Sequence, residues 1–157
     1  MNSKPDETAA EGQGQSAALL ATSFYVHGAL CAVDASIVEE VVRMRRTTPV
    51  PHAPDYLMGV MNLRGKIVSV IDLARKLDLG ATEPCEDSRV YIVRDRSELV
   101  GLLVERAADV IELDGGALEP SPANVRGVES RFVLGIGRAG GRLAALLDPA
   151  AVLSNAA

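Results

Sequence analysis

Short runs of alternating hydrophobic and polar residues are the dominant pattern along this chain. Residues 41–46 illustrate it, because Val42 and Met44 fall on one face of an extended strand while Arg43 and Arg45 fall on the other. Glycine and proline residues break such runs at close intervals, which indicates frequent turns. Short strands joined by tight turns are typical of β-barrels and sandwiches, so we predict an all-β fold. We expect strands over residues 23–26, 30–33, 41–46, 66–73, 90–94, 99–104, 109–113, 132–136 and 142–147.

A single helical turn is predicted over residues 34–39, between the second and third strands. Ser36 and Glu39 have the spacing of a capping box, in which each side chain bonds to the backbone N–H of the other residue. Prolines then mark an extended loop that leads into the Asn-Leu-Arg-Gly corner at 62–65; they are Pro49, Pro51 and Pro54.

Two segments of the chain repeat one another. Residues 56–77 align without a gap on residues 132–153, at a shift of 76 (132 − 56 = 76). The matches include a glycine suited to a tight turn and, after the next strand, an aspartate suited to capping a short helix. The matched pairs are Gly65 with Gly141 and Asp72 with Asp148.

The repeat predicts two related lobes. The segments upstream of each copy echo one another more loosely, since LCAVD and EEVVRM in the first half resemble GLLVE and ADVIEL in the second. We expect a disordered tail over residues 1–21, a first lobe over about 22–80 and a second over about 88–154.

Composition indicates one globular domain and argues against a nucleic-acid surface. The chain has 157 residues, of which 48% are hydrophobic and 24% charged, enough for one core or two small cores that share an interface. The formal net charge is −5, whereas a nucleic-acid surface needs clustered Lys and Arg. The main basic cluster, Arg43 to Arg46, fits the solvated side of an edge strand.

Residues that carry chemistry are present, but not at the spacings that catalysis requires. The two histidines, His27 and His52, do not have the spacing of metal ligands relative to each other. They also do not have it relative to Cys31 or Cys85. Residues 135–140, GIGRAG, match a dinucleotide-binding pattern, but too few residues follow to complete a nucleotide-binding unit. We expect no enzymatic activity, no metal and no cofactor.

The sequence also lacks the features of export and membrane insertion. The N-terminal residues contain no long apolar block, so they do not resemble a secretory signal. The most apolar stretch, residues 17–33, is interrupted by Ser23, His27 and Gly28 and is too polar to span a membrane. We therefore expect a cytoplasmic protein.

Taken together, these motifs resemble the CheW family, the adaptor proteins of bacterial chemosensory arrays. The resemblance covers residues 22–154 and is carried by four segments, GVMNLRGKIVSVIDL at 59–73, LVGLLVERAADVIEL at 99–113, EPSP at 119–122 and LAALLD at 143–148. It implies two pseudo-repeated, SH3-like five-stranded β-barrels packed side by side, with short helices after strands. It also implies a non-enzymatic role, in which the protein connects the regulatory domain of a CheA-type histidine kinase to the cytoplasmic tip of chemoreceptors.

The resemblance further implies a receptor-binding groove. Its residues, carried over position by position, are Val38, Glu40, Gly59, Asn62, Arg64 and Val110. Arg64 offers five donors in a planar fork, which Glu40 on a neighbouring strand can orient. An internal salt bridge that only fixes the corner is the alternative interpretation of Arg64. The family often has a proline where Ser69 stands and a basic residue where Ala74 stands, which affects the fine geometry of this strand.

Three other functional interpretations are open at this point. The adaptor can serve a non-flagellar pathway such as gliding, pili or development, with kinase or receptor binding only. The chain can instead resemble the regulatory module of the kinase itself, or the adaptor part of a larger fusion. A small-ligand binder or enzyme that uses the cleft between the lobes is the third, and it predicts convergent polar or titratable groups in that cleft.

Overall fold

Two five-stranded β-sheets make up most of the protein. The computed structural model describes residues 18–114, 118–120, 124–125, 127–139 and 141–154. The strands are β2 (Ala18–Val26), β3 (Ala29–Asp34), β4 (Val38–Arg43), β5 (Leu57–Leu63), β6 (Lys66–Asp72), β7 (Arg89–Asp95), β8 (Glu98–Val104), β9 (Arg106–Asp114), β10 (Asn124–Val125), β11 (Val128–Glu129), β12 (Val133–Ala139) and β13 (Arg142–Leu147). Short helices connect some of them, namely η2 (Ala35–Ile37), α1 (Leu73–Lys76), η4 (Ser130–Phe132) and α2 (Pro149–Leu153). The predicted all-β fold with two five-stranded units and short helices is confirmed.

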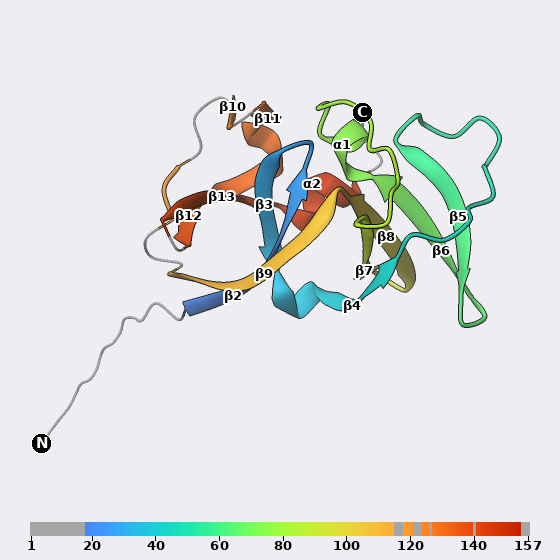
Figure 1. Cartoon of the computed structure of the whole chain (residues 1–157), viewed down its shortest axis with the longest axis horizontal. Coiled ribbons are helices and arrows are strands. Elements are labelled where there is room, and N and C mark those ends of the chain that lie inside the picture. Colours follow the sequence, from blue (N-terminus) through green and yellow to red (C-terminus); the bar gives the residue numbers. More distant parts are fainter. Residues whose placement is uncertain (1–17, 115–117, 121–123, 126, 140, 155–157) are drawn as a thin grey trace, which may run out of the picture.

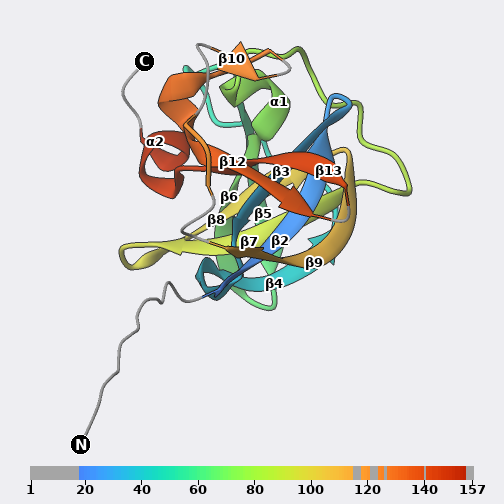
Figure 2. The ribbon, with the colours of Figure 1, turned by 90° about the vertical axis from the view of Figure 1, so that its left-hand side faces the viewer.

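The two sheets form two barrels that lie next to each other (Figure 1). The central barrel has the strand order β4-β7-β8-β6-β5 and the terminal barrel has the order β12-β13-β3-β2-β9. Figure 2 looks onto the terminal barrel, with the central barrel behind it. Each sheet is mixed rather than purely antiparallel, because β6 pairs with β8, and β3 with β13, in parallel.

The barrels do not divide the chain where the sequence placed the lobe boundary. The segment from β4 to β8, residues 38–104, forms the central barrel, while β2 and β3 join β9, β12 and β13 in the terminal barrel. β2 and β3 of the first repeat thus lie in one barrel with β9, β12 and β13 of the second repeat. In the same way, β7 and β8 of the second repeat lie in one barrel with β4, β5 and β6 of the first. The predicted lobes, 22–80 and 88–154, are the two repeats of the sequence and not the two barrels.

Backbone pairing shows that the repeats have the same register. Asp72 N donates to Tyr56 O and Asp148 N donates to Phe132 O, each at 2.8 Å and each offset by the shift of 76 seen in the sequence. The first hairpins correspond at a different shift, because Cys31 in β3 and Val100 in β8 pair with equivalent residues of β13 and β6 (100 − 31 = 69). The molecule thus has an internal pseudo-two-fold relation between its barrels.

Most of the largest buried side chains lie in a seam between the barrels rather than inside either one. The seam cluster takes residues from both sheets and both α-helices, including Phe24, Tyr91, Leu102, Phe132 and Val152. The rings of Phe24 and Tyr91 are 4.9 Å apart between centroids, and each residue is at most 1% exposed. Separate, smaller clusters fill each barrel. Because burial of apolar area drives association, this shared core makes one domain of the two barrels.

Three local predictions need correction. Ala18–Ala21 lie in β2, so the part of the predicted tail that the structure describes is a strand; residues 1–17 lie outside the described residues. The turn after β3 is capped by Asp34, which accepts a hydrogen bond from Ser36 N at 2.9 Å, and Glu39 belongs to β4 rather than to a capping box. Because Asp34 is the N-cap, Ser36 lies inside the turn and cannot cap it. The strand predicted over 41–46 runs from 38 to 43, and two residues of the EPSP motif, 121 and 122, lie outside the described residues.

Candidate partner-binding site

Arg64 occupies a two-residue turn that projects its side chain into solvent. Leu63 and Lys66 are the last paired residues of β5 and β6, so Arg64 and Gly65 form the whole connection. Both have positive φ, 51° and 85°, as the favoured turns of two-residue hairpins require. Asn62 Oδ1 accepts a hydrogen bond from Gly65 N at 3.0 Å and so fixes the turn. The Arg64 side chain remains 64% exposed.

Arg64 forms an ion pair with Glu40 of β4. Its Nη2 atom donates to both carboxylate oxygens of Glu40. β4 and β5 are the two edge strands of the central barrel, so this ion pair connects the edges across the closure of the barrel. Exposed ion pairs contribute only about 0–1 kcal/mol to stability. The ion pair therefore orients the guanidinium without contributing much to stability, and the Arg64 side chain stays mostly exposed.

A second ion pair lies on the same strand and was not predicted from the sequence. Arg94 of β7 donates to Glu39 through Nε at 2.6 Å and through Nη2 at 3.3 Å. The two residues are 55 positions apart, and no sequence pattern relates them. Adjacent carboxylates on β4 are thus each held by an arginine.

Exposed valines stand at equivalent positions on the two barrels. Val41 of β4 pairs with Tyr91, and Val110 of β9 pairs with Thr22. Thr22 and Tyr91 are related by the shift of 69 (91 − 22 = 69), and the same shift relates the two valines (110 − 41 = 69). Val41 is 43% exposed and Val110 is 63% exposed.

Both valines lie on the side of their sheets that faces the seam. Residues directly paired across antiparallel strands share a face, and Tyr91 belongs to the seam core. Thr22 shares its face with Phe24, two residues along β2, which also belongs to the seam core. Leu20 lies on this face as well, 54% exposed, and Val38 packs against the seam core.

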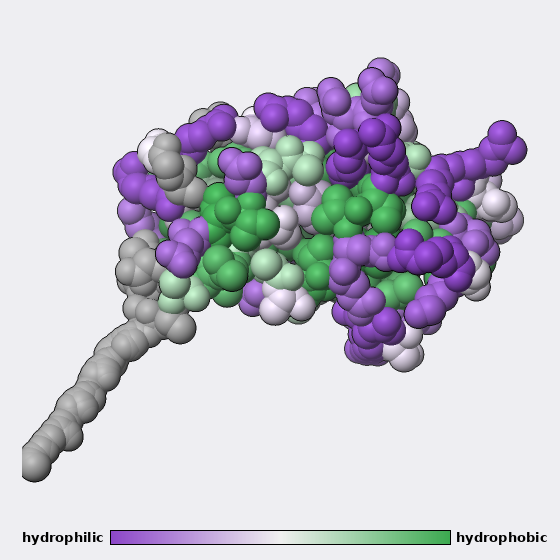
Figure 3. Space-filling model, turned by 60° about the horizontal axis from the view of Figure 1, so that its bottom comes forward, coloured by the Kyte–Doolittle hydropathy of each residue, from purple (hydrophilic) through white to green (hydrophobic). Residues whose placement is uncertain are grey.

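We call Leu20, Val38, Val41 and Val110 the seam face. β4 and β9 both run along the lower side of the molecule in the two ribbon views (Figures 1 and 2). The view from below shows hydrophobic side chains gathered in the middle of this surface, with hydrophilic ones around them (Figure 3). A patch with this arrangement is typical of a protein-binding surface. The sequence suggested Val38 and Val110, but not Val41 or Leu20.

Gly59 differs from the other predicted groove residues because it is buried. Its φ is 141°, and a Cβ built there would lie 2.4 Å from Thr48 O. Thr48 and Val60 exchange backbone hydrogen bonds of 2.8 and 2.9 Å at this point. Gly59 therefore allows the segment after β4 to approach β5 closely, and it has no side chain to offer a partner.

The two matched aspartates cap the two helices. Asp72 is 2% exposed and accepts hydrogen bonds from Ala74 N at 3.1 Å and Thr82 N at 2.9 Å. Asp148 accepts one from Ala150 N at 3.0 Å. Gly65 and Gly141 both have positive φ in the turns before β6 and β13, the strands that lead to the two capped helices. Because both carboxylates are engaged by backbone N–H groups, they are poorly suited to act as an acid and base pair.

The described residues offer little for catalysis. Burial raises the pKa of the Cys31 thiol to about 12, so the thiol stays protonated and is a poor nucleophile. Within the described ranges no group of His, Cys, Asp and Glu is arranged to hold a metal ion. None of the helices in the described part of the chain has both the length and the hydropathy needed to cross a bilayer.

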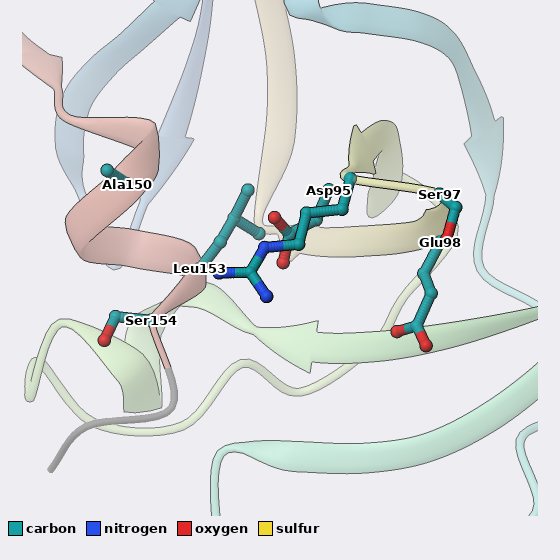
Figure 4. Close-up of a pocket in the computed structure, with 7 residues that line it drawn as sticks. Asp95, Ser97, Glu98, Ala150, Leu153 and Ser154 are labelled. Carbon is teal, nitrogen blue, oxygen red and sulfur yellow. The ribbon is translucent and has the colours of Figure 1, made fainter.

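A pocket of about 610 Å³ lies between the β7–β8 turn and α2. Asp95, Ser97 and Glu98 line one side and Leu153 and Ser154 the other. The close-up shows Glu98 on the side of the pocket opposite α2 and apart from Asp95, so these two carboxylates do not converge (Figure 4). The seam between the barrels is packed with hydrophobic side chains. Neither feature supports the small-ligand interpretation.

The sequence is similar to those of known chemotaxis proteins. Residues 21–157 match the family model described as the CheW-like domain. The chain is 32% identical over 132 residues to chemotaxis protein CheW of Bacillus subtilis (strain 168), covering 84% of this chain and 85% of that protein. It is 31% identical over 116 residues to chemotaxis protein CheW of Rhizobium meliloti (strain 1021), covering 74% and 75%.

A solved structure gives the same result. The crystal structure of scaffolding protein TtCheW from Thermoanaerobacter tengcongensis superposes with a TM-score of 0.79 at 27% sequence identity, over 93% of this chain and 94% of that one. At this coverage the match extends through both barrels. The chain therefore belongs to the CheW family of non-enzymatic chemotaxis scaffold proteins.

Proposed function

We propose that this protein is an adaptor that couples chemoreceptors to a CheA-type histidine kinase in the cytoplasm. The observation that carries the proposal is the seam face, an exposed apolar surface with equivalent valines on two barrels. Arg64 is held by Glu40, the neighbour of Val41 on β4. Such a surface suits a helical partner, whose apolar side chains fill a groove while its polar flank meets a fixed guanidinium. The cytoplasmic tip of a chemoreceptor is a partner of this kind.

The receptor site has a contact layer and a supporting layer. Val38, Val110 and Arg64 belong to the contact layer, and Val41 extends it on the basis of its equivalence to Val110. Glu40 and Asn62 act through Arg64, because one orients the guanidinium and the other fixes the turn. Gly59 acts through the backbone alone.

The kinase site is proposed to lie elsewhere, at the exposed ends of the barrels. An adaptor must hold both partners at once, so the two sites cannot overlap. Exposed strand edges and barrel ends carry unpartnered apolar residues outside the seam face, such as Ile67, which is 63% exposed. The regulatory domain of the kinase is the proposed partner there.

Substitution of Arg64 tests the receptor assignment. We expect Arg64→Ala to weaken binding of a soluble receptor signalling fragment by about tenfold, because it removes a charge-assisted contact. Binding of the kinase regulatory domain is expected to stay unchanged, and the free energy of unfolding to fall by less than about 1 kcal/mol. Fluorescence titration against each partner, with chemical denaturation alongside, measures all three.

Arg94→Ala is the matched control, because Arg94 is also an exposed arginine paired with a glutamate of β4. It should leave receptor binding within about twofold of the wild type. A double-mutant cycle between Arg64 and Glu40 separates contact from positioning. Equal loss of receptor affinity in Arg64→Ala and Arg94→Ala would contradict the assignment of Arg64 to the groove.

A further inference from the structure

Each barrel carries a small surface pocket at an equivalent place. The pocket of the terminal barrel measures about 370 Å³ and that of the central barrel about 530 Å³. Their lining residues correspond in pairs, Leu30 with Leu99 at the shift of 69 (99 − 30 = 69), and Arg142 with Lys66 and Leu143 with Ile67 at the shift of 76 (142 − 66 = 76). The pseudo-two-fold relation therefore gives each barrel an equivalent pocket, lined by different residues.

The two versions differ in charge. The central-barrel pocket contains Lys66 and Arg94, but Glu98 also lines it and Arg94 is paired with Glu39. The terminal-barrel pocket is lined by Arg138 and Arg142 with no acidic residue. The charged side chains that line the central-barrel pocket are nearly balanced, whereas those that line the terminal-barrel pocket are all cationic, in a protein whose formal net charge is −5.

In the terminal barrel, two arginines lie over the aromatic ring of Tyr25. Arg106 places its guanidinium carbon 3.8 Å from the centroid of the Tyr25 ring, and that of Arg142 lies 5.4 Å from the same centroid. Tyr25 itself is only 7% exposed. A guanidinium stacked on a ring keeps its N–H edge free to donate, and stacking reduces the freedom it loses on binding.

These arginines have no acidic partner among the side chains that the structure describes, although Arg64, Arg75, Arg94 and Arg131 all do. Clustered cations that are not neutralised repel one another, which favours binding of an anion. The cluster formed by Arg106, Arg138 and Arg142 around Tyr25 thus has the properties of an unfilled carboxylate-binding surface.

Apolar side chains beside the cluster narrow the kind of anion. Leu143 is 44% exposed and pairs directly with Arg138 across β12 and β13, so the two side chains share a face. Leu30, which is partly buried, lines the same pocket. A nucleic-acid phosphate backbone would make no apolar contact with these leucines. A peptide that carries both acidic and aliphatic residues could contact the arginines and the leucines together.

We propose that the surface formed by Tyr25, Arg106, Arg138, Arg142 and Leu143 is a docking site for an acidic segment of a partner protein that also bears aliphatic side chains. The equivalent surface of the central barrel does not share this preference, because its cations are balanced. The charge difference thereby gives the two barrels distinct partners despite their common fold. The inference does not depend on which partner occupies the seam face.

A labelled peptide tests the proposal directly. The probe is fluorescein-labelled Glu-Glu-Leu-Glu-Glu-Leu, titrated with full-length protein at low and at physiological salt. We expect saturable binding that weakens at the higher salt concentration, and at least tenfold weaker binding by Arg106→Gln/Arg142→Gln. Lys66→Gln, at the position equivalent to Arg142, is the matched control and should bind as the wild type does. The same peptide with glutamine in place of glutamate should not bind.

Two additions keep the test decisive. If the double variant is destabilised, as thermal unfolding would show, Arg138→Glu replaces it, because Arg138 is exposed and takes no part in the stacking on Tyr25. A short oligothymidylate is titrated in parallel. Absence of peptide binding, binding that the arginine variants leave unchanged, or equally tight binding of the oligothymidylate through the same arginines would each overturn the proposal.

Discussion

Replacing Gly59 with alanine is expected to lower the free energy of unfolding by about 3 kcal/mol or more. Two independent costs add at this position. The φ of 141° belongs to a region that residues with a Cβ rarely adopt, and the added Cβ would meet Thr48 O at 2.4 Å. Because that oxygen is backbone and accepts a hydrogen bond from Val60, it cannot move away without loss of the bridge between the two segments.

Gly28→Ala provides the control for the Gly59 prediction. Gly28 also has a positive φ, 85°, but nothing lies within 4 Å of the position where its Cβ would be. It therefore carries the conformational cost alone, about 1 kcal/mol. Urea denaturation of both variants measures the difference. If the two substitutions cost the same, the close approach of Thr48 is not what requires glycine at position 59.

Paired aspartate substitutions on the seam face are expected to weaken receptor binding by at least about 30-fold. Val41→Asp and Val110→Asp place a charge at equivalent points on the two walls of the proposed groove. A helix that packs there would bury each carboxylate without a partner, which costs several kcal/mol. Both valines are exposed in the free protein, 43% and 63%, so the unfolding free energy should change by less than about 1 kcal/mol.

Ile67→Asp is the control for the seam-face substitutions. Ile67 is as exposed as Val110, 63%, but it lies on β6 outside the seam face. The control should bind the receptor fragment as the wild type does in isothermal titration. Retained receptor binding by the double seam-face variant would mean that the receptor docks on another surface.

The part of the fold that could be predicted depended on residues with strict conformational requirements. Gly65 and Gly141 sit in turns with positive φ, and Asp72 and Asp148 cap helices, so both copies of the repeat keep the same residue types. The first hairpin of each repeat has no such residue in common. Its strands need only alternation, and alternation does not say which neighbouring strand they pair with. The sequence therefore could not predict that the first two strands of each repeat join the barrel of the other repeat.

The residues of the proposed binding surfaces could be predicted to different degrees for a similar reason. Arg64 could be proposed from the sequence because it belongs to a contiguous motif around a tight turn. Val41 was missed because its equivalence to Val110 depends on strand register, which the structure supplies. The cluster around Tyr25 was missed because Arg106 and Arg142 come from strands far apart in the sequence and are brought onto one ring by the fold.

A three-component assembly assay tests the central claim most directly. A receptor signalling fragment, the kinase regulatory domain and the full-length protein are mixed in pairs and together, and the complexes are resolved by analytical ultracentrifugation. If the protein is an adaptor, we expect a ternary complex, in which the receptor fragment and the kinase domain sediment together only when this protein is present. The Val41→Asp/Val110→Asp variant should retain the kinase domain and lose the receptor fragment. Competition of the two partners for the same surface, so that binding of one always releases the other, would contradict the account.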